Sequence, residues 1–269
     1  MKADFIIVGV MKSGTTTLAD YCTHHPSIGI PKKEIHFFDY DRNYSQGESW
    51  YSSHLEACRT GTTRILGEKT PYSFYRYTAE RIYNYRQDIK LIWIFRNPVD
   101  RAYSNYNHDL YNVDEWRSFE RCIDQENSRD ILFQYLSKGR YVEQVEDYLA
   151  YFPADQMCFV LFEELLANTD KELKKVFNFL GVDADSFDYT MEVHSKKSMK
   201  PDNAALLYFY KKFVGNRGRL WNYLWRTNFN SSVKPKMNPA TRQKLLEYYK
   251  HWNNLLSEQT GLDLSIWNK

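Results

Sequence analysis

The sequence predicts an α/β fold: a P-loop-like, doubly wound parallel sheet flanked by helices, with a helical C-terminal part. First, apolar runs that end in turn signals alternate with segments of helical periodicity. Second, these runs are continuously apolar, as in parallel strands that are covered on both faces. The 269 residues are 43% apolar and show no internal repeat, so we expect a single domain over residues 1–269.

The expected elements follow one another along the chain. Strands are expected at residues 5–10, 64–68, 90–95 and 157–162. Helices are expected at residues 15–25, 79–86, 98–111, 141–152 and 171–180, and in the last third at 203–214 and 241–258. In an open sheet of this kind, ligands bind outside the carboxyl ends of the strands. The residues that follow the strands therefore carry the functional signal.

The first expected strand leads into the segment KSGTTTL at residues 12–18. Gly9 and Gly14 keep the spacing of a nucleotide-binding loop, but Thr15 stands where the lysine is expected and Lys12 comes three positions earlier. The glycines permit close backbone approach, and a helix N-terminus favours an anion. A plain strand-to-helix turn is the alternative. The candidate anion-binding residues of this loop are Lys12, Ser13, Gly14, Thr15, Thr16 and Thr17.

Two more strand ends add cations. The second expected strand is followed by Lys69, and the third is followed by Arg96. Pro98 then starts a helix, and Ser104 faces back toward the start of that helix. An arginine fork and a hydroxyl can hold a second phosphate, whereas an ordinary ion pair of Arg96 with Asp100 is the alternative. Three cations at neighbouring strand ends predict a site for a polyanion.

Composition narrows the classes of partner. The net charge of +2 is too small to indicate a nucleic-acid-binding protein. The four cysteines lie far apart without a CxxC pair, which suggests neither a zinc site nor a disulfide framework. No apolar run approaches the ~18 residues that a membrane span requires, and the first strand leaves no room for a signal peptide. We expect a cytoplasmic bacterial or viral protein; removal of a leader or anchor is the alternative.

In this order, these residues resemble the sulfotransferases that use 3′-phosphoadenosine 5′-phosphosulfate (PAPS). KEIHFFDYDRNYSQGESWY at 33–51 and GEKTPYSF at 67–74 are similar to motifs of the heparan sulfate 3-O-sulfotransferases. The similarity is strong over about residues 4–110 and weaker beyond, where HSKKSMKP at 194–201 resembles a late loop. The resemblance implies transfer of a sulfuryl group to an acceptor hydroxyl, with 3′-phosphoadenosine 5′-phosphate (PAP) as product. It favours a carbohydrate acceptor, with a lipid or small-metabolite alcohol second.

The resemblance also implies roles for single residues. Glu34 falls on the family's catalytic base, and Lys69 on a lysine beside the transferring sulfuryl group. His36 and Asp39 fall on positions that shape the acceptor site. The loop at 12–17 would bind the 5′-phosphosulfate. The 3′-phosphate would be held by Arg96, Ser104, Ser195, Lys196 and Lys197.

The chemistry asks for the same residue types. Sulfuryl transfer depends on positioning and on stabilising charge at the leaving phosphate, which Lys12 can do while Lys69 steadies the sulfuryl oxygens. Fixed cations make a metal unnecessary. In an extended segment Glu34 and His36 point to the same side, so His36 is the rival base. Candidates for acceptor contacts are the aromatic residues Trp50, Tyr51, Tyr72 and Tyr75.

Two other classes stay open, and the match to the family has gaps. A nucleoside-phosphate kinase should show Gly-Lys-Ser/Thr and an acid at a strand end, where only Glu163 and Glu164 qualify. A non-catalytic glycan-binding relative would keep the cleft without turnover.

Met11 replaces an arginine of the family, and Lys197 and Ser198 replace a Gly-Arg pair.

Overall fold

The computed structural model describes residues 1–130, 133–191, 201–228 and 236–268. The chain divides into two compact units. The first contains residues 1–96, 140–194 and 252–269, and the second contains residues 97–139 and 195–251. The expected single domain over 1–269 is not tested by this division and stays a prediction.

The first unit is built on a five-stranded parallel sheet in the order β2-β3-β1-β4-β5. The strands are β1 (Phe5–Gly9), β2 (Ile28–Gly29), β3 (Ile65–Lys69), β4 (Lys90–Phe95) and β5 (Met157–Leu161). After β1 the chain forms β2 and β3 on one side of it and then β4 and β5 on the other side, which confirms a doubly wound sheet. The four expected strands are present. The edge strand β2 was missed because two residues cannot form an apolar run.

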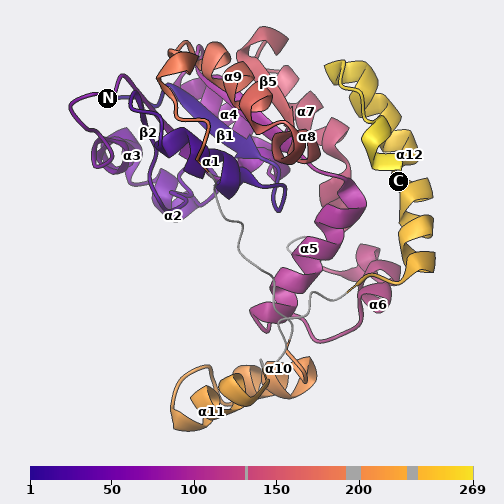
Figure 1. The fold of residues 1–269 in the computed structure, drawn as a ribbon. Coiled ribbons are helices and arrows are strands. Elements are labelled where there is room, and N and C mark those ends of the chain that lie inside the picture. The colour runs from indigo at the N-terminus through magenta and orange to yellow at the C-terminus, as the bar shows by residue number, and fades with distance from the viewer. Residues whose placement is uncertain (131–132, 192–200, 229–235, 269) are drawn as a thin grey trace. The chain divides into compact units, whose positions relative to one another are not determined.

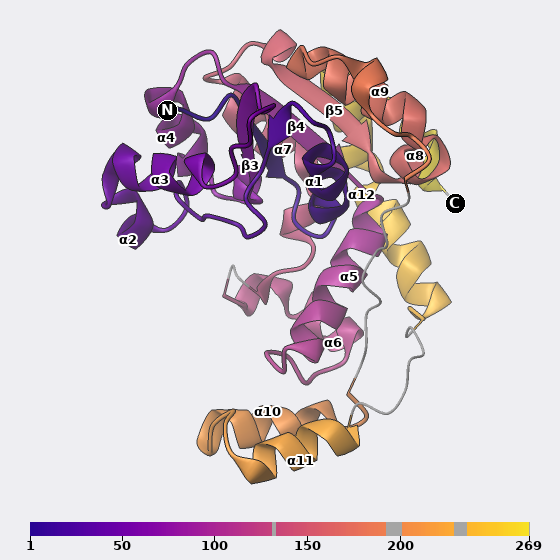
Figure 2. The same cartoon turned by 60° about the vertical axis from the view of Figure 1, so that its left-hand side comes forward.

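Helices cover both faces of this sheet (Figures 1 and 2). Alternate residues of one strand point to opposite faces, so Ile6 and Val8 belong to one apolar core and Phe5 and Ile7 to the other. The helices of this unit are α1 (Thr15–Thr23), α2 (Asp41–Tyr44), α3 (Gly47–Glu56), α4 (Tyr77–Tyr85), α7 (Tyr141–Leu149), α8 (Phe162–Ala167) and α9 (Thr169–Leu180). Its 3-10 turns are Tyr72–Phe74, Ala154–Gln156, Ala184–Ser186 and Ser265–Asn268.

The second unit is helical in its described residues. Its helices are α5 (Pro98–Tyr111), α6 (Phe119–Asp124), α10 (Ala204–Phe213) and α11 (Arg219–Asn228), with 3-10 turns at Glu126–Ser128 and Ser137–Gly139. Helix α12 (Pro239–Thr260) has residues in both units. Pro98 opens α5 as expected, and the Asn97 side chain caps it by accepting from the Val99 amide at 3.0 Å. The helical C-terminal part is thus confirmed.

A search of the described residues for a helix long and apolar enough to cross a membrane finds none.

Candidate active site

The loop between β1 and α1 requires both of its glycines. Gly14 has φ 96° at the N-cap of α1, where a Cβ atom would lie 2.4 Å from the ring of Phe162. A Cβ atom on Gly9 would lie 2.3 Å from Ser73 Oγ. Real side chains cannot approach this closely, so the loop keeps its tight path only with glycine at these positions.

The same loop presents groups that fit an anion. Ser13 is completely buried, and its Oγ atom has no hydrogen-bond partner in the described part of the chain. A buried hydroxyl without a partner is costly, and an anion oxygen would satisfy it. The first amides of α1, from Thr15 to Thr17, have no acceptor within the helix and add a positive dipole end.

The Arg96 side chain lies against the backbone of this loop. The Arg96 Nη1 atom donates to the backbone carbonyl of Lys12 at 3.3 Å. The Arg96 guanidinium also lies over the ring of Phe162, 5.2 Å from its centroid. Lys12 itself has φ 66°, a backbone conformation that is uncommon for residues other than glycine. Arg96, which follows β4, therefore links the end of that strand to the loop after β1.

The third cation, Lys69, is buried at the end of β3. Its Nζ atom lies 4.0 Å from Asp20 Oδ1 on α1. Asp100, the alternative partner of Arg96, pairs with Arg242 of its own unit at 2.6 Å.

The proposed base lies in a chain of three ionisable groups. His36 Nε2 lies 3.2 Å from Glu34 Oε2, and His36 Nδ1 donates to Asp39 Oδ2 at 2.7 Å. The imidazole stacks on Tyr40 with the ring centroids 4.5 Å apart. Asn43 holds the segment by donating to the backbone carbonyls of Ile35 and His36. Glu34 and His36 are thus in contact.

The backbone of this segment is not extended as we expected. His36 has φ 52°, in the left-handed region. The chain turns at His36, and the turn lets one imidazole contact carboxylates on both sides of it in the sequence.

The electrostatics of the imidazole follow from these two carboxylates. Burial opposes the charged form, but the hydrogen bonds to Asp39 and Glu34 outweigh it and raise the pKa of His36 from 6.5 to about 9. His36 is therefore an imidazolium at neutral pH. Both of its nitrogens then carry hydrogen, so it has no lone pair with which to accept a proton.

A buried acid, to which the sequence alone assigned no role, supports this segment. Glu68 on β3 is completely buried and accepts hydrogen bonds from Tyr51 at 2.8 Å, Tyr72 at 2.7 Å and Thr70 at 2.8 Å. Burial raises its pKa, and these hydrogen bonds oppose that rise. The Tyr72 hydroxyl also accepts from the amide of Phe37 at 3.0 Å. A signal was present in the sequence, because Glu68 is an acid that follows the apolar residues Ile65 and Leu66 within one strand.

Other predicted residues are placed differently or not described. Tyr72 is completely buried, and its proposed contact with an acceptor stays a prediction. Ser104 lies on α5 in the second unit, so its convergence with Arg96 also stays a prediction. Ser195, Lys196 and Lys197 lie outside the described residues.

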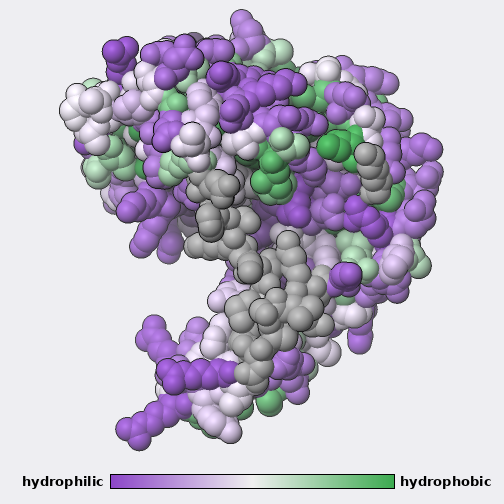
Figure 3. All heavy atoms as spheres, in the orientation of Figure 1, coloured by the Kyte–Doolittle hydropathy of each residue, from purple (hydrophilic) through white to green (hydrophobic). Residues whose placement is uncertain are grey.

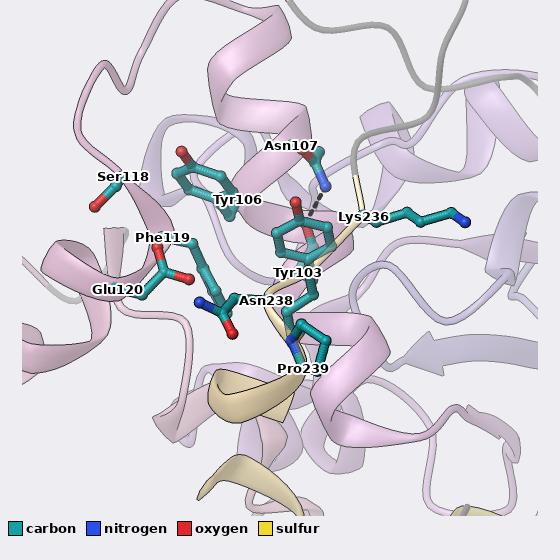
Figure 4. A pocket seen from close by; sticks show the side chains of 10 residues that line it. Tyr103, Tyr106, Asn107, Ser118, Phe119, Glu120, Lys236, Asn238 and Pro239 are labelled. Carbon is teal, nitrogen blue, oxygen red and sulfur yellow. Dashed lines mark hydrogen bonds between the residues drawn. The ribbon is translucent and has the colours of Figure 1, made fainter. Parts of the chain in front are cut away.

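The second unit holds a cavity of about 580 Å³ (Figure 4). Tyr103 and Asn107 of α5 line it together with Phe119 of α6 and with Asn238, which precedes α12. None of the predicted site residues is among its lining residues.

Comparison with known proteins assigns the chain to a family. A family model described as a sulfotransferase domain matches residues 2–259. Mouse heparan sulfate glucosamine 3-O-sulfotransferase 5 is 28% identical over 267 residues, which are 97% of this chain and 72% of that protein. Human heparan sulfate glucosamine 3-O-sulfotransferase 6 is 30% identical over 261 residues, which are 96% of this chain and 72% of that protein.

Solved structures agree. A sulfotransferase from Alicyclobacillus acidocaldarius has a TM-score of 0.75 at 26% identity, with 100% of both chains covered. A mouse sulfotransferase in complex with PAP shares the fold, with a TM-score of 0.51 at 17% identity over 97% of this chain and 89% of that one. These matches leave no support for the kinase alternative. The chain belongs to the sulfotransferase family, and it is a PAPS-dependent sulfotransferase related to the heparan sulfate 3-O-sulfotransferase branch.

Proposed function

We propose that this enzyme transfers the sulfuryl group of PAPS to a carbohydrate hydroxyl, with Glu34 as the general base. The observation that carries the proposal is the contact between Glu34 and His36 at 3.2 Å. With a pKa of about 9, His36 cannot serve as the base at neutral pH. Glu34 lies beside His36, and its side chain is 37% exposed. An acceptor hydroxyl could therefore approach the Glu34 carboxyl group directly.

In this mechanism the acceptor oxygen attacks sulfur in line while the bond from sulfur to the bridging phosphate oxygen breaks. The electron pair of that bond stays on the phosphate of PAP, and the hydroxyl proton goes to Glu34. His36 then acts as a positioning residue: it fixes the Glu34 carboxylate from one side and is itself fixed by Asp39.

We assign the charge stabilisation to the loop and to two strand ends. Lys12 and the amides at the start of α1 would meet the charge that develops on the leaving phosphate, and Lys69 would steady the sulfuryl oxygens. The unpartnered Ser13 hydroxyl supports an anion at this loop. Because fixed cations can neutralise the charge, we propose that transfer needs no metal, and activity should persist in excess chelator.

The 3′-phosphate end of the nucleotide is assigned to Arg96 and Ser104, with Ser195, Lys196 and Lys197 from the late loop. What supports Arg96 is its place at the end of β4, in contact with Lys12. Binding of PAP measured by calorimetry on single variants of these residues tests the assignment.

The carbohydrate acceptor rests on the relatives, whose names identify them as heparan sulfate glucosamine 3-O-sulfotransferases. A lipid or small-metabolite alcohol is the second class. Screening acceptors with PAPS and locating the added sulfate by mass spectrometry distinguishes these classes. The expected cytoplasmic location and the bacterial or viral origin stay predictions.

The deciding experiment replaces Glu34 by glutamine and measures transfer of radiolabelled sulfate. We expect turnover to fall ~10²- to 10⁴-fold, the usual contribution of a general base, with PAP affinity nearly unchanged. Glu80→Gln, at an exposed position on α4, is the matched control and should retain wild-type activity. Near-normal turnover of Glu34→Gln would remove Glu34 from the base role, and a wild-type chain without transfer to any acceptor would indicate a non-catalytic relative.

A further inference from the structure

Helices α10 and α11 form a helical hairpin whose charged residues are all basic (Figures 1 and 2). Residues 203–228 contain no aspartate or glutamate, although the whole chain carries 34 acidic and 36 basic residues. The basic residues of this stretch are Lys211, Lys212, Arg217, Arg219 and Arg226. Such a block of one sign favours an anionic partner.

Most of these cations are available to a partner. Lys211 pairs with Asp114 at 2.5 Å, and so belongs to the packing of the hairpin. The other four, Lys212, Arg217, Arg219 and Arg226, are exposed and have no ion pair in the described part of the chain. Arg217 and Arg219 lie in or directly after the turn between the two helices. Hydrophilic side chains project from this region in the space-filling view (Figure 3).

The hairpin also exposes apolar side chains beyond its buried cluster, although Phe209 contacts Trp116 and Phe213 stacks on Phe209. The inner face of the hairpin is packed, because Leu207 and Trp221 are buried in one apolar cluster with Val113. On the outside, Leu206, Phe209 and Phe213 recur at helical spacing along α10 and are all exposed.

The exposed apolar groups are concentrated toward the turn. Phe213 is 76% exposed, Val214 67% and Leu220 55%. These side chains flank the turn that also carries Arg217 and Arg219. Bulky apolar groups interleaved with cations at the tip of a helical hairpin match the surface of an interfacial membrane-binding element.

We propose that the α10–α11 hairpin docks on an anionic lipid surface, with Phe213, Val214 and Leu220 entering the headgroup region and the arginines contacting lipid phosphates. The helices lie on the membrane and do not span it, because each has 10 residues. A sulfated glycan would satisfy the cations but would leave these apolar side chains in water. The apolar tip therefore favours lipid over a glycan.

The test is co-sedimentation of the full chain with vesicles of phosphatidylglycerol alone or phosphatidylcholine alone. We expect binding to the anionic vesicles only, weakened by added salt. Phe213→Ser should lower the partition coefficient about tenfold, the scale of one buried apolar side chain. Arg217→Glu should lower it roughly tenfold or more, since a favourable charge is replaced by an unfavourable one.

Two matched controls change the same residue types elsewhere. Leu166→Ser alters a residue of α8 that is 59% exposed, and Lys250→Glu alters an exposed residue of α12. Both should bind vesicles like the wild type. PAP binding should be unchanged in all four variants, which separates this inference from the proposed catalytic roles.

Three outcomes would overturn the proposal. Equal binding to both vesicle types, or to neither, would exclude an anionic lipid surface. Binding to heparin that is reduced by Arg217→Glu and untouched by Phe213→Ser, without vesicle binding, would assign the hairpin to a polyanionic chain. Self-association in sedimentation velocity that Phe213→Ser abolishes would assign it to a second copy of this protein.

Discussion

The raised pKa of His36 predicts a specific dependence of stability on pH. The folded pKa of about 9 exceeds the ordinary value of 6.5, so folding favours the protonated form. The resulting stabilisation is fully present below pH 6.5 and is lost as pH rises toward 9. At 1.36 kcal/mol per pH unit the full difference is roughly 3 kcal/mol. Because the side chain is 27% exposed, solvent screening reduces our expectation to about 2 kcal/mol.

The perturbation that isolates this charge is His36→Asn. Asparagine tolerates a φ of 52° better than most residues, so the turn of the backbone is retained while the titrating group is removed. Urea denaturation at a series of pH values gives the free energy of unfolding of both chains, with the slope on urea as a check of two-state behaviour. The stability advantage of the wild type over the variant should shrink by about 2 kcal/mol between pH 6 and pH 9.5.

The other histidines and acids are common to both chains, so their titration cancels in this difference. Asp39→Asn is a second variant, and it should lower the pKa of His36 because it removes the carboxylate at 2.7 Å. A stability difference that stays constant across this pH range would refute the reasoning. In that case His36 would be neutral in the folded protein at neutral pH, and it could again be considered as the general base.

Three further predictions concern the nucleotide loop and its neighbour. Lys12→Ala should lower the rate of sulfate transfer by ~10² or more, as expected on loss of a group that stabilises transition-state charge; full retention of the rate would contradict that role. Arg96→Ala should weaken binding of PAP about tenfold or more with little effect on adenosine 5′-monophosphate, so equal losses for both nucleotides in calorimetry would place the 3′-phosphate elsewhere. Gly14→Ala should destabilise the fold by at least 1 to 3 kcal/mol, roughly the cost of one strained residue, because the added Cβ atom meets Phe162 at 2.4 Å; Gly61→Ala, with open space around it, is the control, and equal melting temperatures would count against the geometry.

The fold was predictable because its strands are buried on both faces. FIIVG, and LIWIF after Lys90, are continuous apolar runs in the sequence and lie in β1 and β4 of the structure. The carboxyl ends of β1, β3 and β4 then fix where Lys12, Lys69 and Arg96 lie in the fold. Runs of this kind carry no information on Ile28–Gly29, whose pairing with β3 is set by tertiary contacts.

The detailed geometry around the proposed base, Glu34, was less predictable. The sequence indicated that Glu34 and His36 point to the same side of an extended segment, and the structure brings them into contact in a different way. An extended strand would alternate its side chains, whereas the structure turns at His36 with φ 52°. Sequence spacing also could not show that Asp39 would reach Nδ1 of the same ring at 2.7 Å. It is this second carboxylate that helps to fix the charge of His36.

The proposed base and the proposed nucleotide loop are held by different parts of the sheet. The segment that carries Glu34 has no regular secondary structure, yet the amide of Phe37 donates to the Tyr72 hydroxyl, which donates in turn to Glu68 on β3. The loop that carries Lys12 is tied instead to the end of β4 through Arg96. Since β1 lies between β3 and β4, a sheet of fixed strand spacing sets the distance between base and loop. An in-line transfer needs such a fixed distance, and the rigid sheet can supply it where two separate loops could not.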